Sequence, residues 1–147
     1  MYSDANVKFN KYPNIHKIIC KRKVHDKVYT AVATCHPNDY DFENELTGEH
    51  YAYVRTLIKE MRVHREEIKA ELKALNHLYN ILEQNDDVSK KSIECYMIRR
   101  QIKLKERDLQ EIKDLIVDTQ TNLRMTIESK DKLYNALRKQ RAAESTT

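Results

Sequence analysis

The sequence predicts a mostly α-helical α+β protein, in which an N-terminal antiparallel β-hairpin is followed by two long antiparallel helices. Three observations indicate this class. The 147 residues include one glycine and two prolines, which leaves few turns and favours few, long elements. β-Branched residues gather on both sides of a polar centre between residues 14 and 36. Beyond residue 41, apolar residues recur three and four positions apart over two long stretches.

The β-hairpin is expected over residues 14–36, with its turn at His25-Asp26-Lys27. On its second strand one face carries tyrosine, alanine and cysteine, and the small residues predict close packing against a helix. That face comprises Tyr29, Ala31, Ala33 and Cys35. Residues 1–13 are polar apart from Val7 and Phe9, so we expect a flexible N-terminal arm or a short edge strand there.

Two long helices are expected over residues 41–84 and 89–140, with Ser89 or Ser92 as the cap of the second. Residues 141–147 are expected to form a disordered tail. At 1.5 Å per residue, each helix would be roughly 60 Å long. The apolar stripe of the first is Val54, Leu57, Ile58, Met61, Ile68, Leu72, Leu75, Leu78, Tyr79 and Leu82.

These stripes predict self-association of the chain, which at this length we expect to be a single domain over residues 1–147. Both stripes drift around their helices, so a two-helix layer leaves apolar flanks in water, where exposure costs about 25 cal/mol per Å². An isolated hairpin is also marginal in water. We therefore expect a homodimer or a higher oligomer.

Composition argues against membrane and disulfide-rich classes. Mean hydropathy is −0.81, and no apolar run approaches the roughly 20 residues that a membrane span needs. No secretory signal is apparent, so we expect a cytoplasmic protein, in the host cell's cytoplasm if a phage encodes it. The three cysteines lack CxxC spacing, which favours reduced thiols over a disulfide framework or a zinc site.

The sequence also lacks the motifs of the common enzyme classes. None of the six histidines belongs to an HExxH motif, Gly48 stands alone without a phosphate-binding loop, and no GxSxG motif occurs. We therefore expect no enzyme, no cofactor and no metal. Ligand binding without catalysis is the remaining small-molecule function.

Arginines and lysines beside apolar or aromatic residues are the candidate ligand contacts, because guanidinium groups bind phosphates and tyrosines stack on bases. Amides can read a base edge. The candidates are Arg22, His25, Tyr29, Arg62, Arg65, Asn76, Tyr79, Asn80, Tyr96, Arg99, Arg100, Lys103 and Arg107. The alternative is ordinary: exposed helical charges commonly serve solvation and i,i+4 pairing, and tyrosines at helical spacing commonly belong to cores or interfaces.

The segment Cys35-His36-Pro37-Asn38-Asp39, followed by Asp41-Phe42-Glu43, resembles a strand-to-helix junction of small phage proteins. With the long helices behind it, the chain resembles the Thoeris anti-defence family of phage proteins. This resemblance implies a homo-oligomeric sponge that sequesters cyclic ADP-ribose isomers made by bacterial TIR immune enzymes, and also small cyclic oligonucleotides, without cleaving them. It implies no ligand residues beyond the junction, so the candidates above rest on chemistry.

Two other functions stay open. The amphipathic helices alone would suit a coiled-coil structural or regulatory protein that binds and inhibits a host protein. Binding to a nucleic-acid polymer ranks third, because basic and acidic residues alternate instead of forming one stripe.

Overall fold

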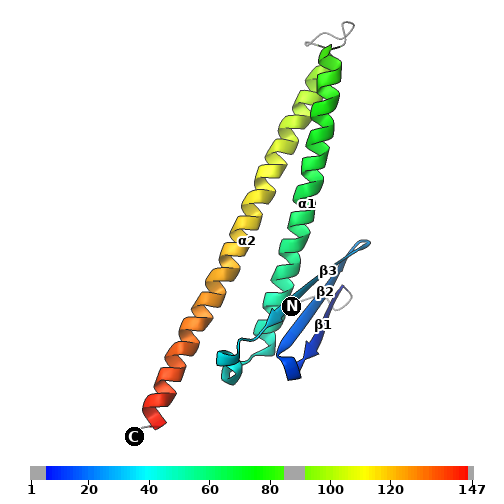
Figure 1. Cartoon of the computed structure of the whole chain (residues 1–147). Helices are drawn as coiled ribbons and strands as arrows, with labels where there is room; N and C mark the ends of the chain where they lie inside the picture. The colour runs from blue at the N-terminus through cyan, green and yellow to red at the C-terminus, as the bar shows by residue number, and fades with distance from the viewer. Residues whose placement is uncertain (1–5, 85–91, 146–147) are drawn as a thin grey trace. The chain divides into compact units, whose positions relative to one another are not determined.

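The computed structural model describes residues 6–84 and 92–145, and it is mostly helical with an antiparallel sheet at its N-terminal end (Figure 1). The elements, in chain order, are β1 (Val7–Tyr12), the 3-10 helix η1 (Pro13–Ile15), β2 (Lys17–Val24), β3 (Lys27–Thr34), the 3-10 helix η2 (Pro37–Phe42), α1 (Glu45–Gln84) and α2 (Ile93–Ser145). No helix within these described residues combines the length and apolar character needed to cross a membrane.

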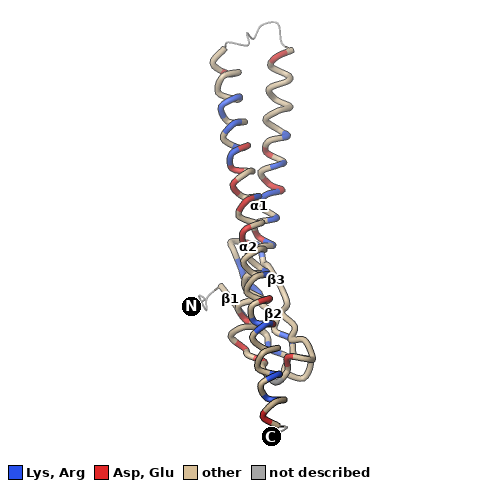
Figure 2. Tube along the Cα trace, turned by 90° about the vertical axis from the view of Figure 1, so that its left-hand side faces the viewer, with Lys and Arg blue, Asp and Glu red and all other residues tan. Residues whose placement is uncertain are grey.

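The chain divides into two compact units. The first, here called the sheet unit, comprises Met1–Glu60 with Asp118–Thr147. The second comprises Met61–Val117 and is called the hairpin unit after its two helical segments, not after the β-hairpin. Both long helices contribute to both units, and both carry basic and acidic residues along their length (Figure 2).

The sheet has the order β1-β2-β3, and both strand pairs are antiparallel. The predicted β-hairpin is confirmed as β2 and β3. For residues 1–13 we expected a flexible arm or a short edge strand. The flexible arm is wrong for Val7–Tyr12, which form the edge strand β1. Val7 and Phe9 explain this strand. They pair with Arg22 and Cys20, so they share the face that packs on the core, where Val7 is buried.

The inner face of the sheet packs against α1, as the small residues of β3 predict. Tyr29, Ala31 and Ala33 are buried, whereas Val28 and Val32, on the other face, are exposed. The core cluster joins strand residues to Ala52 of α1, and Phe9, Tyr51 and Tyr53 pack around it. It comprises Val7, Cys20, Ala33 and Ala52.

The junction between β3 and α1 is built from local capping. His36 is extended, as a residue before proline prefers, and its ring Nδ1 accepts a hydrogen bond from the Asn38 amide at 3.1 Å, which starts η2. Asn44 Oδ1 then accepts from the amides of Leu46 and Thr47, at 2.9 and 3.3 Å. Helix α1 therefore begins at Glu45 instead of residue 41.

The bounds of the second helix also differ from the expectation of 89–140. Ser92 is its cap, because Ser92 Oγ accepts from the Cys95 amide at 3.3 Å, so α2 begins at Ile93. The helix continues to Ser145, and the disordered tail predicted over 141–147 is wrong for residues 141–145. Residues 146–147, Ser89 and the predicted connection between the helices lie outside the described residues.

In the hairpin unit, α1 and α2 lie side by side as an antiparallel pair (Figure 1). Between Met61 and Leu82 of α1 the buried and half-buried positions alternate in steps of four and three, the spacing of a coiled-coil seam: Met61, Arg65, Ile68, Leu72, Leu75, Tyr79 and Leu82. Cys95 and Ile116 are buried on α2, and Lys105 forms an ion pair with Glu71 across the helices. Leu78 is 44% exposed, so its place in the predicted buried stripe is wrong.

Candidate ligand-binding site

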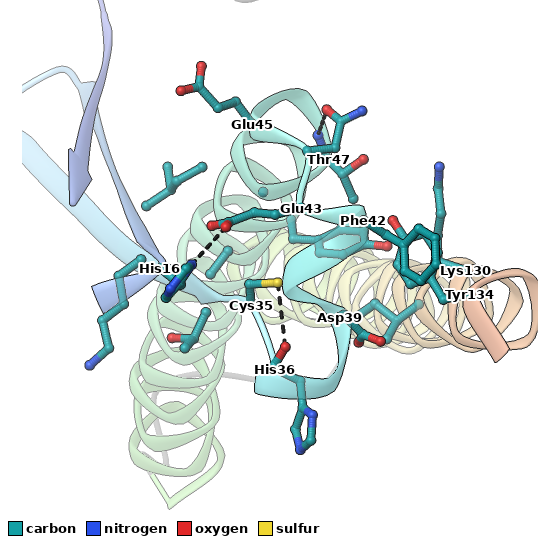
Figure 3. Close-up of a pocket in the computed structure, with 18 of the residues that line it drawn as sticks. His16, Cys35, His36, Asp39, Phe42, Glu43, Glu45, Thr47, Lys130 and Tyr134 are labelled. Carbon is teal, nitrogen blue, oxygen red and sulfur yellow. Dashed lines mark hydrogen bonds and ion pairs between the residues drawn. The ribbon is translucent and has the colours of Figure 1, made fainter. Parts of the chain in front are cut away.

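The sheet unit contains a cavity of about 680 Å³, within the size range of small-molecule sites. Its walls come from the ends of β1, β2 and β3, from η2, from the first turns of α1 and from the segment of α2 between Ile127 and Arg138 (Figure 3). Residues separated by some hundred positions in the sequence thus line one space.

An aromatic pair lies between η2 and α2 at this cavity. The rings of Phe42 and Tyr134 are stacked, with centroids 5.0 Å apart and planes 6° from parallel. The guanidinium carbons of Arg138 and Arg141 lie 5.8 and 4.6 Å from the Phe42 centroid, so two cations flank the stack. Planar, π-rich surface next to positive charge is suited to a base that carries phosphate.

Arg138 also ties α2 to η2. Its Nη1 donates to the Asn38 carbonyl at 2.6 Å and to Asp39 Oδ1 at 2.7 Å. The Asp39 side chain is 18% exposed and that of Arg138 33%, so this ion pair is partly shielded from water. The position of the Phe42–Tyr134 stack is therefore fixed by a charge-assisted contact next to it.

A second stack involves Tyr40, two residues before Phe42 on η2. The His16 ring lies over Tyr40, with centroids 3.6 Å apart and planes 15° from parallel. His16 Nδ1 is 2.7 Å from Glu43 Oε2 (Figure 3). His16 adopts a left-handed backbone conformation, φ 53°, at the end of η1. Tyr40 and Glu43 together hold the His16 ring, and His16 lines the cavity.

Neutral phenols and a neutral thiol line the interior. Burial raises the pKa of Tyr51, and nearby Tyr134 and Asp131 raise it further. Burial likewise raises the pKa of Tyr134. Burial raises the pKa of the Cys35 thiol, and the charges of Glu43 and Asp39 add to this effect. These groups are protonated at neutral pH and act as hydrogen-bonding, uncharged walls.

Positive charge is available at the cavity. Lys17 and Lys130 line it, and neither forms an ion pair within residues 6–84 and 92–145. Lys11, by contrast, pairs with Glu45 and Glu49, at 3.0 and 2.9 Å. Two lysine ammonium groups could thus meet an anion without first breaking an ion pair.

The predicted contacts Arg22 and Tyr29 are brought together, but inside the interface between sheet and α1. Arg22 is 8% exposed, and its guanidinium lies 5.6 Å from the Tyr29 ring and 5.9 Å from the Tyr53 ring. Its donors are engaged by Thr56 and Glu60. His25 lies at the exposed β2–β3 turn with φ 54°. None of these three candidates lines the cavity.

The other ten predicted contacts lie in the hairpin unit. Arg65 and Tyr79 occupy seam positions, where Arg65 Nε is 3.2 Å from Glu66 and a hydrogen bond to Glu83 raises the pKa of Tyr79. Arg100 and Arg107 are exposed and, being seven residues apart, share the side of α2 opposite its seam. The remaining six are exposed along one flank of the seam, by their heptad positions: Arg62, Asn76, Asn80, Tyr96, Arg99 and Lys103.

The cavity residues of α2 were not among the sequence candidates. Lys130, Tyr134 and Arg138 recur at steps of four on one face of α2, but this spacing is also that of an ordinary helix stripe. The available signal was the junction from Cys35 to Phe42, several residues of which line the same cavity. Within the described residues, no group of three histidine, cysteine, aspartate or glutamate side chains is arranged to hold a metal.

Comparison with models of protein families finds no match for this sequence. Curated proteins and solved structures likewise give no match. The resemblance to the Thoeris anti-defence family therefore stays a prediction.

Proposed function

We propose that the chain is a non-catalytic binding protein that sequesters a small nucleotide of the cyclic ADP-ribose type, and that the cavity of the sheet unit is where the nucleotide binds. The observation that carries this proposal is the combination, in one cavity, of stacked aromatic rings with lysines that form no ion pair among the described residues. A base would lie against the Phe42–Tyr134 pair, and a pyrophosphate would meet Lys17 and Lys130.

The size and polarity of the cavity support a nucleotide over a smaller anion. A space of about 680 Å³ is far larger than a single phosphate needs. Apolar contributions from Ile18, Ala33 and Ile127 lie among polar groups in the lining. Such a lining removes a base from water while charged groups at its edge hold phosphate.

Sequestration without cleavage needs affinity and no bond chemistry. The carboxylates of Asp39 and Glu43 are held by Arg138 and His16, and the Cys35 thiol is protonated at neutral pH. These groups are therefore occupied as positioning contacts. In a phage-infected cell such binding would deplete the immune signal made by TIR enzymes, which is the role that the resemblance implies.

Isothermal titration calorimetry with a panel of cyclic ADP-ribose isomers and cyclic oligonucleotides tests this function. We expect saturable binding of at least one nucleotide and its recovery intact by chromatography after incubation. Lys130→Met should weaken binding about 10- to 100-fold, the effect of one charge-assisted contact. Lys132→Met is the matched control, because Lys132 is an exposed lysine of the same helix that does not line the cavity. A flat titration of the folded wild-type protein against the whole panel would remove the proposal.

A second candidate function is protein binding, and a specific surface favours it. On the flank of the hairpin unit opposite Arg62 and Arg99, large apolar side chains are exposed: Leu78 at 44%, Ile81 at 50%, Met97 at 53% and Leu104 at 46%. Large apolar side chains exposed together on one flank are typical of an interface. We propose that it pairs two copies of the chain.

Sedimentation of wild-type protein and of Leu78→Gln/Met97→Gln tests the pairing. We expect a wild-type dimer or higher oligomer and a smaller species for the variant. A wild-type monomer at micromolar concentration contradicts self-association. Recovery of one stoichiometric host protein in a pull-down, lost in the same variant, would instead favour the regulatory alternative.

A further inference from the structure

The hydroxyl group of Tyr51 is exceptional among the described residues. Tyr51 is on α1, and its ring packs against the core cluster of Val7, Cys20, Ala33 and Ala52. Its oxygen is inaccessible to solvent and, within the described part of the chain, is the one buried side-chain nitrogen or oxygen with no hydrogen-bond partner. Buried polar groups in folded proteins nearly always have a partner, so this one requires an explanation.

The position of Tyr51 supplies that explanation. The residue lines the cavity, together with Tyr134 and Asp131 from α2 and Arg55 from α1. No protein group satisfies this hydroxyl, and its residue lines a cavity of ligand size, so a ligand that displaces the atoms covering the oxygen would supply the missing partner.

The charges around Tyr51 indicate which kind of ligand atom its hydroxyl would bond. The phenol is protonated at neutral pH because burial raises its pKa, so it can donate a hydrogen bond. The negative charge of Asp131 and the positive charge of Arg55 act on Tyr51 with opposite signs, so their effects partly cancel at its hydroxyl. An uncharged acceptor, such as a ring nitrogen or exocyclic oxygen of a base, matches a position without net charge. The neighbouring Phe42–Tyr134 stack is where a base is expected.

We propose that Tyr51 Oη donates a hydrogen bond to an uncharged acceptor on the base of the bound nucleotide, and that Tyr51 is thereby a specificity-determining residue of the cavity. This inference rests on the proposed function. It also explains why an unpaired hydroxyl is kept in an otherwise packed core: its partner arrives with the ligand.

Tyr51→Phe tests the inference through two readouts that move in opposite ways. In the ligand-free protein the variant loses only an unpaired polar atom, so we expect a urea midpoint equal to or above that of wild type. Its affinity for the cyclic ADP-ribose isomer that binds wild type best should fall about 3- to 10-fold, the loss of one uncharged hydrogen bond. Tyr40→Phe is the control, because Tyr40 stacks on His16 and does not line the cavity.

The outcomes distinguish a failure of this inference from a failure of the proposed nucleotide binding on which it rests. A clearly lower urea midpoint for Tyr51→Phe would show that the hydroxyl already has a partner in the folded protein, and it would overturn the inference without any ligand. Wild-type affinity in Tyr51→Phe, with wild-type protein binding normally, would overturn the inference alone. A wild-type protein that binds no nucleotide of the panel overturns both proposals.

Discussion

Arg22 of β2 donates a hydrogen bond from Nε to the hydroxyl of Thr56 on α1, over 3.2 Å. Both residues are buried, with Thr56 fully inaccessible, and the Thr56 hydroxyl donates in turn to the Tyr53 carbonyl at 2.6 Å. Glu60, one turn further along α1, accepts from the same guanidinium. A chain of polar contacts thus fixes which turn of α1 lies on which strand.

Replacing Arg22 should therefore destabilise the sheet unit. Arg22→Met removes the bonds to Thr56 and leaves Glu60 without its cation, and breaking a buried pair in this way costs about 3–5 kcal/mol. Because the Glu60 side chain is 34% exposed, water recovers part of this, and we expect about 2–4 kcal/mol from urea denaturation followed by circular dichroism. Lys21→Met, at the exposed neighbouring position, should change stability by less than about 0.5 kcal/mol. Equal stabilities of the two variants would contradict a structural role for Arg22.

The contact between Asp39 and Arg138 should hold the last turns of α2 on η2. Arg138→Met removes the donors to Asp39 and to the Asn38 carbonyl, and we expect a loss of about 1–2 kcal/mol, since the pair is partly shielded from water. Hydrogen exchange should accelerate in α2 after Asp118 and in η2. Lys139→Met provides the comparison on the exposed side of the helix. Unchanged protection in Arg138→Met would mean that apolar packing alone holds the segment.

Local sequence patterns were sufficient to predict β2, β3 and the two long helices, because these elements are set by neighbouring residues. The alternation of Tyr29, Ala31 and Ala33 predicted the buried face of β3, and the steps of three and four predicted the seam of α1. β1 was harder, because Val7 and Phe9 alone show alternation there and their pairing with β2 depends on the core that Ala52 completes.

The cavity could not be predicted in the same way, because long-range contacts create it. Asp39 and Arg138 are 99 positions apart, and nothing local to either indicates that they meet. Arg22 shows the opposite error. Its guanidinium group made it a candidate phosphate contact, whereas Arg22 and Cys20 both point to the buried face of β2, which places the guanidinium in the interior. The face of the strand on which Arg22 lies was therefore a better guide to its burial than its charge.

The single glycine of the chain, Gly48, lies where α1 approaches β2 closely. A Cβ atom there would be 2.7 Å from Ile18 Cδ1, the end of a side chain that can rotate. Gly48→Ala gains helix propensity of about 1 kcal/mol and loses about 0.5–1.5 kcal/mol to the displaced rotamer, so we expect a net change within about 1 kcal/mol.

A double-mutant cycle with Ile18→Val separates these effects on folding stability. Valine lacks Cδ1, the atom in conflict, so the alanine should be more favourable in the Ile18→Val background by about 0.5–1 kcal/mol. Additive changes in the free energy of unfolding would show that Ile18 already yields without cost.

Cys35 should react slowly with alkylating reagents, and the rate should depend on a particular neighbour. Burial first, and then the charges of Glu43 and Asp39, raise the pKa of the Cys35 thiol, so its thiolate fraction at pH 7.5 is smaller than that of an ordinary cysteine. The alkylation rate should keep rising with pH beyond the ordinary range of a thiol. Glu43→Gln removes one of the charges, which lowers the pKa and should increase the rate at pH 7.5 about 2- to 5-fold.

Peptide-mapped mass spectrometry with iodoacetamide measures this rate separately from that of Cys20, whose thiol is fully buried and whose pKa burial also raises. Glu45→Gln is the matched control, because Glu45 lies two residues further along, lines the same cavity and is not among the charges that act on Cys35. If both variants accelerate alkylation equally, the cause is loosening of the junction between η2 and α1. If Glu43→Gln alone does so, the carboxylate acts through its charge.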